Sequence, residues 1–124
     1  MTRLPAISES RRAGSDLAMR LDLTQELIQF DGHFPGMPML PAVAQIDWAI
    51  TLARDGFSLP ARVRALRSLK FLRIVQPPVQ LTLELSLRRD GCSVDFVYAH
   101  GGSPCATGRI EFADDAPGPD RSVL

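Results

Sequence analysis

The feature that most constrains this fold is a strict alternation of apolar and polar residues over positions 79–87, Val-Gln-Leu-Thr-Leu-Glu-Leu-Ser-Leu. A period of two predicts a β-strand that buries one face. The next four residues, 88–91, end in Asp-Gly, a pair typical of a tight hairpin turn. Residues 92–99 then return to the alternating pattern, so we expect them to pair antiparallel with the first strand.

Weaker signals of the same kind predict the rest of a sheet. Alternating or β-compatible residues occupy positions 17–23, 62–75 and 105–112. The run His-Gly-Gly-Ser-Pro at 100–104 predicts a turn. Together with the hairpin, these stretches predict four or five long antiparallel strands.

One helix interrupts the strands. Residues 42–54 are helix-compatible and mostly apolar. Pro41 suits the first position of a helix, where a missing N–H costs nothing, and Gly56 suits its C-terminal cap. A helix that is apolar nearly all round is expected to be buried. Its larger apolar residues on one face are Val43, Ile46 and Ile50.

One long helix with an antiparallel sheet is an α+β fold, and the sheet must cover the helix because the chain offers nothing else. A sheet wrapped around a central helix is the hot-dog arrangement. We expect a single domain over residues 15–113, after a flexible lead-in at 1–14 and before a disordered tail at 114–124. The exposed edge of such a sheet would be satisfied by pairing across a two-fold axis.

Composition excludes several classes of function. The 124 residues carry a formal net charge of zero, so no overall field points to nucleic acid. No apolar stretch approaches the roughly 18 residues of a membrane span, and the first residues lack the apolar core of a secretory signal. A cytoplasmic protein is therefore expected. Cys92 and Cys105 make neither a disulfide framework nor a metal-binding pattern. We expect both to be small buried residues that lie in strands.

The chemistry is concentrated between His33 and Asp47. The loop that contains His33 is rich in proline and glycine, which excludes a regular helix. Histidine is the usual general acid or base near neutral pH, and a carboxylate is its usual partner. Asp47 falls in the apolar helix, where a charge is costly without a partner or a task. We interpret the segment as an active-site loop that leads into a core helix.

The same segment carries a resemblance to a family. Its run Gly-His-Phe-Pro-Gly-Met-Pro-Met-Leu-Pro at 32–41, with an acidic residue fourteen positions after the histidine, resembles the β-hydroxyacyl-acyl carrier protein dehydratases of fatty-acid synthesis. The flanking Gln-Ile-Asp-Trp at 45–48 is more similar to the dehydratase-like proteins of bacterial aryl-polyene clusters. The later strand order is compatible with the family over positions 16–113. The resemblance implies a hot-dog enzyme that removes water from 3-hydroxyacyl thioesters bound to acyl carrier protein.

The resemblance also implies roles for individual residues, without a metal or organic cofactor. His33 would take the α-proton of the substrate, and Asp47 would handle the departing hydroxyl, directly or through water. The enolate oxygen would need preorganised donors, which the backbone at Ala42 offers at the positive end of the helix. Gly36 would let the loop approach the substrate closely.

By the same resemblance the site would lie between two subunits. His33 would face Asp47 of the partner subunit, so the site would exist only in a homodimer or a higher assembly of dimers. The acyl chain would occupy an apolar tunnel at the interface, lined by Phe34, Met37, Met39 and Trp48. For the last three of these, ordinary packing is the more frequent role of such side chains.

The chain departs from the family at Ala42, where glycine is usual. A backbone N–H survives the change, but alanine would be strained if the position needed a positive φ. The methyl group also narrows the space beside the thioester, which bears on rate and substrate size.

Other interpretations stay open. A hot-dog thioesterase would share the fold, and the products would separate the two activities. A third interpretation, kept open by Ala42, is an inactive or acyl-binding subunit that partners another hot-dog chain. His100 has no partner in the sequence, and a structural role is favoured. One basic run is either a solvated strand face or a docking patch for acidic carrier protein; it contains Arg62, Arg64, Arg67, Lys70 and Arg73.

Overall fold

A computed structural model describes residues 4–24, 40–76 and 79–113. Within these ranges one helix and six strands follow the chain in the order β1 Ala6–Ala13, β2 Asp16–Leu23, α1 Ala42–Phe57, β3 Val63–Phe71, β4 Val79–Leu87, β5 Ser93–His100 and β6 Ser103–Phe112. The strands form one antiparallel sheet in the order β1-β2-β4-β5-β6-β3. The α+β prediction is confirmed, with six strands in the described ranges instead of four or five.

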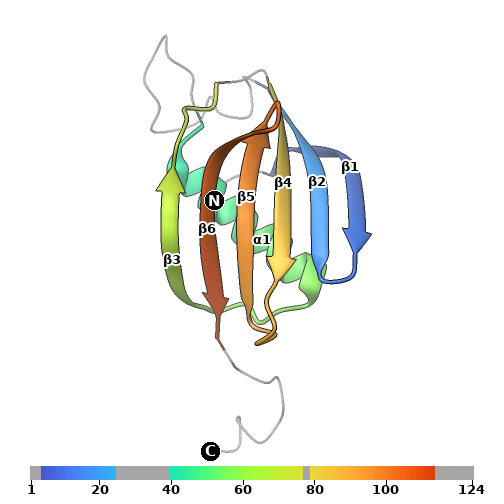
Figure 1. Ribbon diagram of the computed structural model, residues 1–124, viewed down its shortest axis with the longest axis vertical. Coiled ribbons are helices and arrows are strands. Elements are labelled where there is room, and N and C mark those ends of the chain that lie inside the picture. The colour runs from blue at the N-terminus through green and yellow to red at the C-terminus, as the bar shows by residue number, and fades with distance from the viewer. Residues whose placement is uncertain (1–3, 25–39, 77–78, 114–124) are drawn as a thin grey trace, which may run out of the picture.

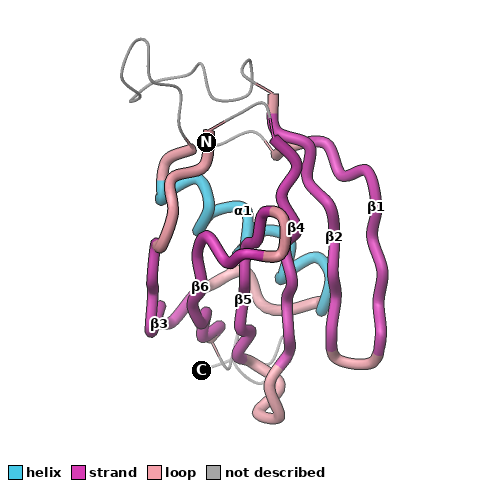
Figure 2. The backbone as a smooth tube through the Cα atoms, turned by 45° about the horizontal axis from the view of Figure 1, so that its top comes forward, coloured by secondary structure: helices cyan, strands magenta, loops and turns pink. Residues whose placement is uncertain are grey.

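The single helix crosses one face of this sheet. In Figure 1, α1 runs obliquely behind the strands, from the β3 edge toward β2. Figure 2 shows the same crossing after a 45° turn. Between the helix and the sheet lies one apolar core, because both elements bury their apolar faces against each other.

The sheet buries its core face through the alternation read from the sequence. On β4, Leu81, Leu83 and Leu85 are fully buried, while their neighbours along the strand are partly or fully exposed. β5 and β2 repeat the pattern, and Leu83 lies opposite Tyr98 on one side and Met19 on the other. The predicted turn also forms, with Gly91 at φ 76°. These strands and their hairpin confirm the sequence prediction.

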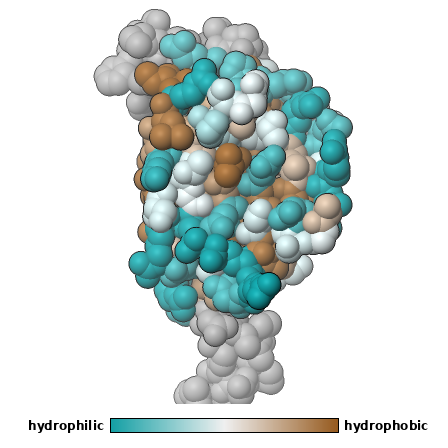
Figure 3. Space-filling model, in the orientation of Figure 1, coloured by the Kyte–Doolittle hydropathy of each residue, from teal (hydrophilic) through white to brown (hydrophobic). Residues whose placement is uncertain are grey.

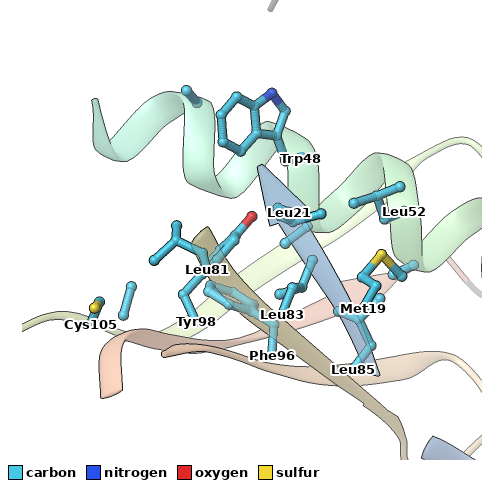
Figure 4. Packing of buried hydrophobic residues seen from close by; sticks show 14 of the residues in the cluster. Met19, Leu21, Trp48, Leu52, Leu81, Leu83, Leu85, Phe96, Tyr98 and Cys105 are labelled. Atoms are coloured by element: carbon cyan, nitrogen blue, oxygen red, sulfur yellow. The ribbon is translucent and has the colours of Figure 1, made fainter. Parts of the chain in front are cut away.

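The helix is buried along one face and not all round as expected. Its buried residues are Ala44, Gln45, Trp48, Ala49, Leu52 and Ala53. Figure 4 shows Trp48 and Leu52 on α1, with the labelled leucines of the sheet below the helix. Val43, by contrast, is 73% exposed, and Ile46 and Ile50 are only half-buried. The expected burial of the helix nearly all round is therefore wrong at Val43, while Ile50 still packs against the core.

Gly56 does not cap the helix as predicted. The helix continues to Phe57, and Ser58 at φ 55° occupies the left-handed capping position. Gly56 is needed for close approach instead, since a Cβ there would lie 2.5 Å from Leu17 Cδ2 of β2. The Gly56 carbonyl oxygen accepts a hydrogen bond from the Arg12 guanidinium, which ties the end of the helix to β1.

The first strand was hidden in the sequence. The predicted flexible lead-in at 1–14 is wrong for residues 6–13, which form β1. Every residue of β1 is exposed, so no alternation marks it. It pairs with β2 from Ala6 opposite Asp22 to Ala13 opposite Asp16. Residues 114–124, the predicted tail, lie outside the described part of the chain.

Two smaller predictions can be compared with the fold. Cys105 is buried on β6 as expected, whereas Cys92 is only half-buried and lies in the turn before β5. No helix in the described ranges has the length and apolar character needed to cross a membrane.

Candidate active site

Helix α1 places Asp47 on the side turned away from its own sheet. At 3.6 residues per turn, Asp47 lies about 200° around the helix from buried Gln45. It shares a stripe, at intervals of four and three residues, with Val43 and Ile50. The carboxylate thus lies between two apolar side chains on the outer face of the helix.

No cation neutralises this carboxylate within the described residues. Asp47 is half-buried, and neither an ion pair nor a hydrogen bond to its side chain is found there. Burial raises the pKa of Tyr98 in the core, and the negative charge of Asp47 raises it further. A half-buried carboxylate without a counter-ion is typical of a functional group.

Tyr98 connects the sheet to the helix turn that carries Asp47. It lies on β5, fully buried, and its hydroxyl donates a hydrogen bond of 2.6 Å to the backbone carbonyl oxygen of Gln45. Figure 4 shows this hydroxyl directed toward α1. Apolar packing alone is not directional, so this bond helps to fix where along its axis the helix rests.

The start of α1 offers free backbone donors. Pro41 is the N-cap residue and no side chain caps the helix. Pro41 accepts hydrogen bonds from the N–H groups of Ala44 and Gln45. The N–H groups of Ala42 and Val43 have no such acceptor in the described ranges, as is general for a first turn. These two donors, with the positive end of the helix dipole, suit a developing negative charge.

Alanine at position 42 is accommodated without backbone strain. Among the described residues other than glycine, a positive φ occurs only at Ser58 and Ser68. Ala42 begins a regular helix, so alanine at this position costs nothing in backbone conformation.

Sequence reasoning missed Gln45. Its side chain is 4% exposed, and Nε2 donates a long hydrogen bond of 3.5 Å to the Leu40 carbonyl oxygen. Oε1 is buried without a hydrogen-bond partner among the described residues. The available signal was an amide in the middle of an apolar helix, where a buried polar group needs a partner or a purpose.

An apolar surface surrounds the start of the helix. Val43 is joined there by three exposed residues at and beyond the end of β3, namely Phe71, Leu72 and Ile74. In Figure 3 hydrophobic surface gathers at the upper left, over the C-terminal end of β3. β3 is also an edge strand, so its outer side has no neighbour in the sheet of one chain. Apolar side chains clustered at a sheet edge mark an interaction surface.

The remaining predicted site residues divide into two groups. His33, Phe34, Gly36, Met37 and Met39 lie outside the described residues, so their predicted roles stay predictions. Trp48 is described and is fully buried in the core between α1 and the sheet. Its predicted place in the tunnel lining also stays a prediction.

Two residues of the basic run between Arg62 and Arg73 form ion pairs on the outer face of the sheet. Glu111 of β6 lies 3.6 Å from Arg64 and 2.6 Å from Arg67. Lys70 and Arg73 make no ion pair with a described residue. His100 is exposed at the end of β5. The described ranges contain no group of three or more His, Cys, Asp or Glu side chains that could hold a metal ion.

Comparison with known proteins gives a family match over most of the chain. The family model described as ApeI-like, ApeI dehydratase, matches residues 9–109. No curated protein matches the sequence closely enough to count as a relative. The matched range contains the loop of His33, the helix of Asp47, the four complete strands β2 to β5, and parts of β1 and β6.

Solved structures show the same fold. The dehydratase heterocomplex ApeI:P from Xenorhabdus doucetiae is 28% identical, with a TM-score of 0.78 over 90% of this chain and 99% of that one. The dehydratase domain of a mycocerosic acid synthase-like PKS is 14% identical, with a TM-score of 0.66 over 94% and 41%. Zebra fish thioesterase superfamily member 2 is 10% identical, with a TM-score of 0.65 over 84% and 78%. The last two likenesses concern the hot-dog fold alone.

Proposed function

From the premise that this chain belongs to the ApeI-like dehydratase family, we propose that it converts 3-hydroxyacyl thioesters, bound to a carrier protein, into trans-2-enoyl thioesters. The observation that carries the proposal is Asp47, a half-buried carboxylate without a cation partner in the described ranges, on the outer face of the helix. It stands fourteen residues after His33, the spacing of the family motif.

The proposed reaction uses two side chains and the helix start. His33 takes the α-proton, and the electron pair moves toward the thioester carbonyl, whose oxygen becomes enolate-like. The free N–H groups of Ala42 and Val43 stabilise that oxygen. The C–O bond at carbon 3 then breaks, and the hydroxyl leaves as water after Asp47 passes to it, directly or through water, the proton that His33 has taken. His33 is then neutral and Asp47 is again a carboxylate, so both groups are restored.

We further propose that the site is completed by a second copy of the chain. The outer stripe of α1 and the apolar end of β3 would be buried in such a dimer, where Asp47 would meet His33 of the partner subunit. The support is the exposed Val43 and Ile74 beside an unpaired sheet edge. The heterocomplex from Xenorhabdus doucetiae keeps open a different hot-dog chain as the partner.

Carrier-protein docking is proposed for the same end of the molecule. Lys70 and Arg73 are exposed there, close to the end of β3, and neither forms an ion pair with a described acidic residue. An acidic carrier protein would be attracted by these charges, and the attraction would weaken as salt is added. Arg64 and Arg67 are assigned instead to the solvated face of the sheet, because both form ion pairs with Glu111.

The test is mass spectrometry of carrier-bound 3-hydroxyacyl thioesters after incubation with the enzyme. Loss of water is the expected product change. His33→Ala or Asp47→Asn should lower the rate by about 100-fold or more, since general acid–base groups contribute that much. Asp55→Asn is the matched control, because Asp55 is an exposed carboxylate on the same helix.

Three results would redirect the proposal. Free acid and free thiol would identify a thioesterase. Activity that appears only after a second hot-dog chain is added would identify a subunit that needs a different partner. Full turnover by both variants would remove His33 and Asp47 from the mechanism.

A further inference from the structure

A buried amide at the start of α1 has unused hydrogen-bonding capacity. Gln45 is held by a single long hydrogen bond from Nε2 to the Leu40 carbonyl oxygen. Turning the amide over would place two carbonyl oxygens against each other, so the donor belongs on the Leu40 side. Oε1 is therefore the atom without a partner among the described residues. An acceptor that is buried and unpaired lowers stability, so this atom is available to a hydrogen-bond donor from outside the described residues.

The amide belongs to a pocket at the helix start. Gln45 lines a surface pocket of about 190 Å³ together with Leu40, Ala42 and residues 71–74. Helical side chains lean toward the N-terminus, which brings the Gln45 amide toward the first turn. The free N–H groups of Ala42 and Val43 belong to that turn. One end of the helix thus combines two unused donors with one unused acceptor.

We propose that Oε1 of Gln45 accepts a hydrogen bond from the 3-hydroxyl group of the acyl thioester. The inference rests on the proposed function and adds a substrate-binding residue to it. A 3-hydroxyacyl thioester carries an acceptor, its carbonyl oxygen, and a donor, its hydroxyl, two carbons apart. The carbonyl oxygen meets the free N–H groups, and the hydroxyl hydrogen meets Gln45. The hydroxyl oxygen keeps its lone pairs for the proton that turns it into water.

This contact would separate substrate from product. The enoyl product has lost the hydroxyl and with it the donor, so Oε1 is left unpaired again after turnover. A site that hydrogen-bonds a substrate hydroxyl discriminates against ligands that lack it. Gln45 therefore favours binding of the 3-hydroxyacyl form and release of the enoyl form.

The experiment measures dissociation constants for three N-acetylcysteamine thioesters, 3-hydroxyhexanoyl, hexanoyl and trans-2-hexenoyl, in an Asp47→Asn background that does not consume them. In the protein with Gln45, the hydroxylated ligand should bind best. Gln45→Met, nearly the same size, should weaken that ligand roughly tenfold and leave the other two unchanged. Its melting temperature should be unchanged or higher, because an unpaired buried acceptor has been removed.

Other outcomes overturn the inference. Equal weakening of all three ligands would mean that Gln45 serves the fold or meets the amide of the cysteamine arm; S-ethyl thioesters, which lack that amide, separate these two. No change in any ligand would mean that Oε1 meets a buried water. If Gln45→Met does not fold, Gln45→Glu keeps an acceptor and must retain the preference for the hydroxylated ligand.

The outcome for the proposed function is measured separately. Turnover is assayed with Asp47 intact, whereas binding is assayed without it. Hydroxyl-specific binding without dehydration would refute the proposed reaction and support the Gln45 contact. Dehydration with no hydroxyl preference in binding would do the reverse.

Discussion

The hydrogen bond between Tyr98 and the backbone of Gln45 leads to a quantitative prediction. Tyr98→Phe removes the hydroxyl and keeps the ring, which makes an edge-on contact with Phe96 at a centroid distance of 5.9 Å. The Gln45 carbonyl remains an acceptor for its own helix, so no buried group is orphaned. The cost near neutral pH should therefore be that of one net hydrogen bond, about 1 kcal/mol, or about 4 °C in melting temperature.

The same substitution should become stabilising at high pH. Burial and the charge of Asp47 raise the pKa of Tyr98, so the hydroxyl stays protonated in the folded protein. In the unfolded chain it ionises above about pH 10, which favours unfolding by about 1.4 kcal/mol for each further pH unit. The stability that Tyr98 contributes is present below pH 10 and is lost as the pH rises. Phenylalanine carries no such penalty, so the two proteins should be equally stable at about pH 10.7, and the variant should be the more stable one at about pH 11.

The assay is urea unfolding of both proteins from pH 8 to pH 11, with tryptophan fluorescence as the measure of unfolding. The chain has one tryptophan, Trp48, which is fully buried, so the fluorescence reports on a single site. It also has one tyrosine, so any ionisation of tyrosine is that of Tyr98. Tyr98→Leu should cost more at every pH, about 2–4 kcal/mol, because it also removes aromatic packing. A cost for Tyr98→Phe that stays constant up to pH 11 would refute the protonated, buried hydroxyl.

Two further substitutions test the packing and the proposed dimer. Gly108→Ala should lower the free energy of unfolding by about 1–3 kcal/mol, because its Cβ would lie 2.6 Å from Leu69 Cδ2 and 2.7 Å from Phe96 Cε2. An unchanged urea midpoint would contradict that packing. Val43→Glu should convert a dimer to monomers in light scattering while the helix persists, since an acidic residue suits the first turn. A variant that remains dimeric would locate the interface elsewhere.

The strands were predictable because one face of each is buried. On β2, β4 and β5 every second side chain is buried in the core, so apolar and polar residues alternate along the sequence. β1 could not be found this way, because both of its faces are exposed and it is held by backbone pairing with β2.

The orientation of the helix was harder to predict for a related reason. Val43 is apolar, yet it is largely exposed in the single chain, while Ile46 and Ile50 are only half-buried. Hydrophobicity indicates that a side chain avoids water and does not indicate which surface covers it. Asp47 was found through its motif spacing, whereas Gln45 was noted only as part of the flanking run 45–48 and became a candidate when its unpaired oxygen was located.

The helix is tied to the sheet through main-chain atoms. Tyr98 binds the carbonyl oxygen of Gln45 near one end, and Arg12 binds the carbonyl oxygen of Gly56 at the other. A backbone carbonyl is present whatever amino acid occupies the position. Mutation can therefore exchange the side chains that α1 presents to a ligand without releasing the helix from its support. The position of α1 therefore does not depend on the side chains that determine which ligand is bound, so related chains can change substrates while the helix stays in the same place.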